Sequence, residues 1–98
     1  MDVDKVIAAL NSKLRREILK IISEQPMTVI QVLGKLKKRE IDVKYRETVY
    51  RALEKLFDAG LVDKIYIKEK GLCYKIAVNH IVIDITKGTI EEGNPQVA

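Results

Sequence analysis

The spacing of the apolar residues changes once along this chain, at Gly60. Before that glycine, apolar residues recur three and four positions apart, which is the period of an amphipathic α-helix. After it, in residues 65–78, large apolar residues recur at every second position, as they do in a β-strand. A chain of 98 residues has room for one domain. The sequence therefore predicts an α+β domain in which the helices come first.

Four helices are predicted, over residues 2–10, 13–24, from Thr28 onward, and about 45–59. Ser12 and Thr28 are N-cap residue types, Pro26 ends the second helix, and Gly60 suits the positive φ that follows a helix C-terminus. A basic, irregular stretch is expected from Lys37 to Lys44. The residues expected on the apolar helix faces are Val3, Val6, Ile7, Leu10, Leu14, Ile18, Leu19, Ile21, Ile22, Val29, Val32, Leu33, Leu36, Val49, Ala52, Leu53, Leu56 and Phe57.

A β-hairpin follows the helices, and a further strand follows the hairpin. The hairpin strands are predicted at Ile65–Lys68 and Leu72–Val78, with a turn at Glu69–Gly71 between them. The further strand is predicted from His80 to Ile85, before a second turn at residues 86–89. Three to four helices and then a hairpin that forms the wing is the element order of the winged helix-turn-helix fold.

The positive charge gathers in the middle of the chain. The formal net charge is +4. Residues 35–55 contain eight basic and four acidic side chains, so this segment alone carries a surplus as large as that of the whole chain. Such a basic segment is typical of nucleic-acid binding. The cluster at its start, which contains Lys35, Lys37, Lys38 and Arg39, is expected to be an ordinary solvated face.

Residues 48–62 read Thr-Val-Tyr-Arg-Ala-Leu-Glu-Lys-Leu-Phe-Asp-Ala-Gly-Leu-Val. This run resembles the recognition helix and helix-to-wing turn of winged-helix regulators, and its Thr-Val-Tyr-Arg-x-Leu motif resembles the ferric uptake regulator family. Lys35–Val43 is similar to that family's lead-in to the recognition helix. Residues 16–22 are similar to the arsenic-repressor family. The resemblance covers residues 5–78 and implies a transcription regulator that binds DNA.

The metal ligands of both families are missing. Ferric uptake regulators carry a His/Cys-rich dimerisation domain, and Ile83 and Thr86 stand where its Cys-x-x-Cys pair is expected. Arsenic repressors often place two cysteines on a helix, whereas this chain has one cysteine, Cys73, and one histidine, His80. A zinc site of this type needs about four such ligands. No metal and no cofactor are therefore predicted, and Cys73 is interpreted as an ordinary thiol rather than a redox sensor or an intersubunit disulfide.

The predicted DNA contacts lie on the fourth helix and at the hairpin tip. Arg46 and Tyr50 are four residues apart and are expected to share the helix face opposite the buried one. Arginine can donate two hydrogen bonds to guanine, and the resemblance assigns base contacts to Tyr50. The alternative is a solvated face on which Glu47 and Glu54 pair with Arg51. The full predicted set is Lys44, Tyr45, Arg46, Thr48, Tyr50, Arg51, Lys55, Lys68 and Lys70. Thr28 is expected to cap its helix or to bind a phosphate.

We therefore expect a sequence-specific regulator that binds double-stranded DNA, with the helix at about 45–59 in the major groove. The wing, at about 62–78, is expected on the backbone or in the minor groove. A homodimer is expected because palindromic operators call for a two-fold protein. Its surface would be the apolar face of the first helix or the strand Ile81–Ile83. The alternative is a winged-helix interaction module of a larger complex that does not bind DNA.

Other classes of protein fit the sequence poorly. No nucleophile–base pair and no glycine-rich phosphate loop is visible, so an enzyme is not expected. The single cysteine, the short apolar runs and the acidic start of the chain indicate a cytoplasmic protein with no membrane segment. Residues 1–91 are predicted to form the DNA-binding domain, and residues 92–98 a frayed tail.

Overall fold

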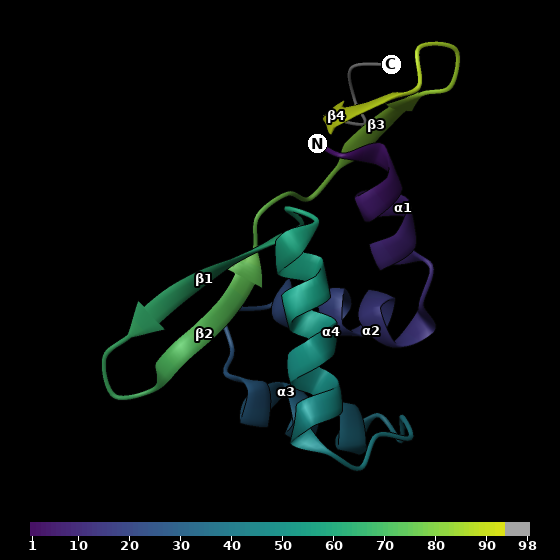
Figure 1. Ribbon diagram of the computed structural model, residues 1–98. Helices are drawn as coiled ribbons and strands as arrows, with labels where there is room; N and C mark the ends of the chain where they lie inside the picture. Colours follow the sequence, from purple (N-terminus) through teal and green to yellow (C-terminus); the bar gives the residue numbers. More distant parts are fainter. Residues whose placement is uncertain (94–98) are drawn as a thin grey trace.

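The computed structural model describes residues 1–93, which form four helices followed by two antiparallel hairpins (Figure 1). The α+β order predicted from the sequence is confirmed. The elements are α1 (Val3–Leu10), α2 (Lys13–Ile22), α3 (Val29–Lys38), α4 (Arg46–Asp58), β1 (Val62–Ile67), β2 (Gly71–Ile76), β3 (Ile81–Asp84) and β4 (Thr89–Glu92).

Side-chain caps start the first three helices. Asp2 Oδ1, Ser12 Oγ and Thr28 Oγ1 each accept a hydrogen bond from the backbone N–H three residues on, at 3.0, 3.2 and 3.2 Å. Gln31 completes a capping box at α3 by accepting from the Thr28 N–H at 3.0 Å. Helix α4 differs, because Tyr45 at its N-cap makes no side-chain cap. Gly60 follows the end of α4 with a φ of +80°, as predicted.

The core lies where α4 crosses the other elements. Helix α4 runs through the centre of the molecule and packs against α1, α2, α3 and β1 (Figure 1). The largest side chains that are fully buried are Tyr74, Ile18, Ile21, Ile22, Met27, Leu36, Leu53, Leu56, Val6, Val32, Val49 and Val62. The predicted inner face of α4 is confirmed by the burial of Val49, Ala52, Leu53 and Leu56.

Several local predictions were wrong. Lys37 and Lys38 are the last turn of α3, so the irregular stretch begins at Arg39. Phe57 was expected in the core but lies exposed on α4 beneath the ammonium group of Lys64, 4.3 Å from the ring centroid. Thr89 was assigned to a turn, yet it begins β4, a strand that the sequence analysis did not predict.

The hairpin β1–β2 is the predicted wing, and the loop before α3 anchors it. Met27 and Tyr74 form an antiparallel bridge, with N–H to carbonyl distances of 3.0 and 2.8 Å. The tip turns because Glu69 and Gly71 have φ angles of +79° and +98°. The Lys70 N–H closes this turn on the Ile67 carbonyl at 3.0 Å. The tip of the hairpin therefore lies beyond the point where the bridge holds it.

The second hairpin, β3–β4, lies beside the N-terminal end of α1, at the other end of the molecule from α3 (Figure 1). Ile90 attaches it to the core, while Val82 and Ile83 are exposed. Asp84 organises its turn by accepting from the Lys87 N–H and the Thr86 hydroxyl, both at 2.9 Å, and these bonds lower the pKa of Asp84. Glu92 ends β4, and residues 94–98 of the predicted tail lie outside the described part of the chain.

Within residues 1–93, no helix is long and apolar enough to cross a lipid bilayer.

Candidate nucleic-acid interface

A groove of about 620 Å³ opens between the start of α3, the first half of α4 and the hairpin β1–β2. We call it the wing groove. The capped start of α3 supplies one wall, α4 supplies a second wall, and the hairpin supplies the third. Its lining residues are Thr28, Val29, Ile30, Arg46, Glu47, Tyr50, Lys70, Leu72 and Tyr74.

The wing groove combines apolar surface with cations. Ile30, Tyr50 and Leu72 come from three different elements, and their exposed fractions are 61%, 46% and 46%. Arg46 and Lys70 add positive charge from α4 and from the hairpin tip, and Glu47 adds one carboxylate, which is paired with Arg51. Exposed apolar side chains beside two cations suit a ligand that has both charged and flat apolar parts, as nucleic acids do.

Three of the predicted contact residues, Arg46, Tyr50 and Lys70, line this one groove. The face of Arg46 and Tyr50 differs from the prediction. They lie on the flank of α4 that faces the hairpin, and not opposite its buried side. A helix advances by about 100° per residue, which leaves Glu47 and Arg51 to point most directly away from the core.

Arg51 forms an ion pair on that outer face. Its guanidinium nitrogen lies 2.6 Å from Glu47 Oε1, and both side chains are exposed. The predicted pairing of Glu47 with Arg51, which was part of the alternative to DNA contact, is confirmed. The other part was wrong, because Glu54 binds Lys64 and Tyr74 instead of Arg51. An exposed pair at this spacing stabilises a helix by only about 0.3–0.5 kcal/mol, so Arg51 can exchange Glu47 for another anion at little cost.

The remaining predicted residues do not line the wing groove. All are exposed, and their contact with DNA stays a prediction. Lys44 and Tyr45 lead into α4, Thr48 and Lys55 lie on α4 itself, and Lys68 follows β1 at the hairpin tip.

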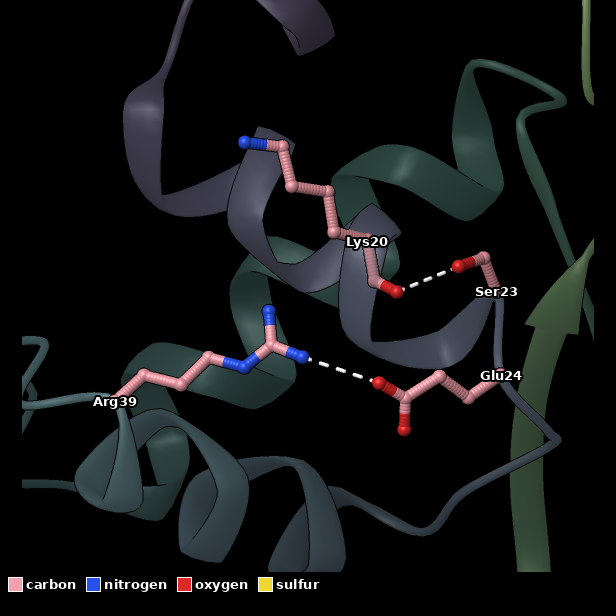
Figure 2. A network of polar contacts seen from close by, with 4 residues as sticks. All are labelled: Lys20, Ser23, Glu24 and Arg39. Atoms are coloured by element: carbon pink, nitrogen blue, oxygen red, sulfur yellow. Dashed lines mark hydrogen bonds and ion pairs between the residues drawn. The ribbon is translucent and has the colours of Figure 1, made fainter.

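The basic cluster on α3 includes a structural contact. The guanidinium of Arg39, at the C-cap of α3, lies 3.1 Å from Glu24 Oε1, just beyond α2 (Figure 2). In the same region the Ser23 hydroxyl donates to the Lys20 carbonyl at 2.6 Å. This ion pair therefore connects the C-terminal end of α3 with the C-terminal end of α2.

A second polar network was not predicted from the sequence. The Tyr74 hydroxyl donates to Glu54 Oε2 at 2.5 Å, and the Lys64 ammonium lies 2.8 Å from the same oxygen. The network joins β1 and β2 to α4 at the inner end of the wing groove. The only sequence signal was a tyrosine on the inward side of a strand, which, when buried, needs a partner for its hydroxyl.

Hydrogen bonds set the charge of this network. The bonds from Lys64 and then from Tyr74 hold the pKa of Glu54 below its ordinary value of 4.5. Burial, and next the bond to Glu54, raise the pKa of Tyr74, so its hydroxyl stays a donor at neutral pH. The carboxylate therefore remains ionised down to mildly acidic pH.

This pKa difference predicts a pH-dependent contribution to stability. Because the folded-state pKa of Glu54 is lowered, its contribution is complete above about pH 4.5 and is lost as the pH falls through the folded value. At pH 7 we expect Glu54→Gln to lower the unfolding free energy by on the order of 1 kcal/mol. The measurement is urea unfolding of both proteins from pH 7 to pH 3. The difference in unfolding free energy between the two proteins should decrease as the pH falls. An increase would contradict the conclusion that the ionised Glu54 carboxylate stabilises the fold.

Cys73 is a buried thiol, with its sulfur 3.7 Å from the Gly71 carbonyl oxygen. Its burial agrees with an ordinary structural role. Among residues 1–93, no group of three or more His, Cys, Asp or Glu side chains is placed to hold a metal ion.

Comparison with protein families identifies the family of this chain. The family model described as "Ferric uptake regulator family" matches residues 9–96. No curated protein matches the sequence. The resemblance predicted from the sequence is thereby confirmed.

The solved structures share the fold. An ArsR-like transcriptional regulator from Rhodococcus sp. RHA1 has a TM-score of 0.59 and 23% identity, over 76% of this chain and 63% of that one. The ferric uptake regulator of Vibrio cholerae has a TM-score of 0.60 and 20% identity, over 88% and 70%. That of Helicobacter pylori has a TM-score of 0.60 and 22% identity, over 89% and 63%. The fold is thus the predicted winged helix, and the chain spans 63–70% of the length of these solved chains.

Proposed function

This chain belongs to the ferric uptake regulator family, and from that premise we propose that it binds double-stranded DNA and regulates transcription in the cytoplasm. The observation that carries the proposal is the convergence of Arg46, Tyr50 and Lys70 on one groove. They come from α4 and from the tip of the hairpin that follows it, and each can contact a nucleic acid. Residues 1–91 would form the binding unit, and no catalytic role is proposed.

In the proposed complex, α4 enters the major groove and the hairpin follows the flanking backbone or minor groove. Arg46 and Tyr50 would contact base edges, because arginine pairs with guanine and an aromatic ring can pack on a thymine methyl group. Lys68 and Lys70 would contact phosphates from the hairpin tip. Thr28, at the start of α3, would hold a phosphate on the opposite wall of the wing groove.

Phosphate contacts make such binding dependent on salt. If about four cations per protomer each neutralise one phosphate, raising the salt from about 50 mM to about 200 mM should weaken binding roughly 100-fold for a single bound protomer and roughly 10,000-fold for a dimer that makes about eight such contacts. The measurement is fluorescence anisotropy of a labelled duplex across this range. Lys68→Ala should reduce the slope of log affinity against log salt concentration by about one, the value for one phosphate contact. Lys87→Ala, in the turn between β3 and β4, should leave the slope unchanged. No binding at low salt would contradict the proposal.

The second candidate is a protein-interaction module, which the exposed apolar side chains of the wing groove favour. Ile30 and Leu72 are exposed there and could receive an apolar side chain of a protein partner. The salt titration separates the two functions, since a protein-binding groove would give no salt-dependent affinity for duplex DNA.

We also propose that the protein acts as a homodimer. The apolar face of α1 offers less surface for this purpose, because Val6 is buried and Val3 and Leu10 pack on the core, which leaves Ile7 as its exposed residue. The hairpin β3–β4 is the better surface, with exposed Val82 and Ile83 on a sheet of only two strands. Selection of bound sequences from random duplexes, in the same low-salt buffer, should return a palindrome. A consensus without two-fold symmetry would contradict a dimer on DNA.

The family name implies a metal ion, and the arrangement of residues 1–93 does not fit one. Cys73 is buried, and His80 is exposed with no group of further ligands among residues 1–93. No step that depends on a metal is proposed.

A further inference from the structure

Tyr74 links the hairpin to two other parts of the molecule. Its backbone pairs with Met27 in the loop before α3. Its hydroxyl donates to Glu54 on α4, and its ring lines the wing groove. One residue of the hairpin therefore contacts α4 through its side chain and the loop before α3 through its backbone.

Glu54 is the α4 partner in this contact. Arg46, Tyr50 and Glu54 follow one another at intervals of four residues, so they form one row along the helix. The first two line the wing groove, and the third reaches the hairpin. Lys64, on β1, binds the same carboxylate and lies over the Phe57 ring, so the ammonium is fixed on two sides.

We propose that the Tyr74–Glu54–Lys64 network is a positioning device that holds the hairpin at a set separation from α4, so that Lys70 and Arg46 reach one duplex together. This inference rests on the proposed DNA binding. A two-stranded hairpin is at best marginally stable alone, and its tip lies beyond the Met27 bridge. A hairpin already fixed in place loses less conformational freedom on binding, which leaves more of its contact energy as affinity.

The chemistry of the network supports a positioning role over simple space filling. A phenylalanine at position 74 would bury nearly the same ring, so the hydroxyl is not needed to fill the core. Hydrogen bonds depend on direction, and this one crosses from β2 to α4. The oxygen that accepts from Tyr74 also pairs with Lys64, so the two strands of the hairpin are held at one point.

The test compares Tyr74→Phe and Glu54→Gln with the unaltered protein. Hydrogen exchange should speed up about 10-fold at hairpin amides, including that of Lys70, while α4 amides stay protected. Tyr66→Phe is the matched control, because this exposed tyrosine on β1 makes no side-chain hydrogen bond within residues 1–93 and its exchange should not change. Glu54→Gln keeps the inference testable if Tyr74→Phe proves unstable.

DNA affinity supplies the second readout. Lys70→Ala should weaken duplex binding about 5- to 10-fold in the unaltered protein, and by much less in the Tyr74→Phe background, where the tip is no longer held in place. The inference would be overturned if the hairpin amides exchanged at unchanged rates in both network variants. It would also be overturned if Lys70→Ala weakened duplex binding equally in the unaltered protein and in the Tyr74→Phe background. Failure of the unaltered chain to bind duplex DNA would instead contradict the proposed function, and the exchange experiment would still report whether the network holds the hairpin.

Discussion

Replacing Arg46 or Tyr50 with alanine is expected to weaken specific duplex binding severely and to leave the fold intact. Both side chains are exposed, so neither change removes core packing. Each lost base contact should cost roughly 1–3 kcal/mol, which is about 5- to 150-fold in Kd. Since both residues lie on the same flank of α4, the double variant should retain only the binding that does not depend on sequence.

The measurement is titration of the selected sequence and of an unrelated duplex at one salt concentration. Lys87→Ala is the control for a lost positive charge, because this exposed lysine lies in the turn of the second hairpin. Circular dichroism and thermal unfolding should report the same fold for every variant. Unchanged affinity for the selected sequence in both alanine variants would rule out the groove assignment.

Leu53→Ala should give the largest loss of stability of any single change proposed for this chain. Leu53 has no exposed surface and lies on the buried side of α4, the helix that packs against α1, α2, α3 and β1. Truncating a fully buried leucine removes its transfer free energy and leaves a cavity, at a cost of about 2–5 kcal/mol. Small domains are stable by only about 5–15 kcal/mol, so much of the fold's stability depends on this residue.

Urea unfolding at neutral pH measures the effect. Ile85→Ala is the matched control, because Ile85 is 88% exposed and should change the unfolding free energy by no more than about 0.5 kcal/mol. A cost below about 1 kcal/mol for Leu53→Ala would mean that the core can close over the cavity and that α4 is less central than its contacts indicate.

The helices could be predicted because their signals are local. Ser12, Thr28 and Gly60 stand at positions where helix geometry favours their residue types, and each performs the expected task. The buried face of α4 followed from its period alone. The strand β4 was missed because it has four residues, of which only Ile90 is buried. This segment is a strand because it pairs with β3. Its own sequence contains no capping residue and no apolar period that would indicate a strand.

The candidate site was predicted as a set of residues and not as an arrangement. The sequence identified Arg46, Tyr50 and Lys70, but their convergence depends on how the hairpin packs against α4. Glu54 shows why the partner of a side chain could not be predicted from the sequence. Spacing on one helix offered Arg51 as its partner, whereas the tertiary fold brings Lys64 and Tyr74 closer. Contacts between elements decide such pairings, and single-element periodicity contains no information about them.

The bridge between Met27 and Tyr74 has a consequence for the order in which the molecule assembles. It joins two segments that are far apart in the chain, with the whole of α3 and α4 between them. Closing so long a loop is slow unless the intervening residues are already compact. On the ribosome, the early helices can therefore gather first, while the backbone of Met27 stays hydrated until Tyr74 emerges from the exit tunnel.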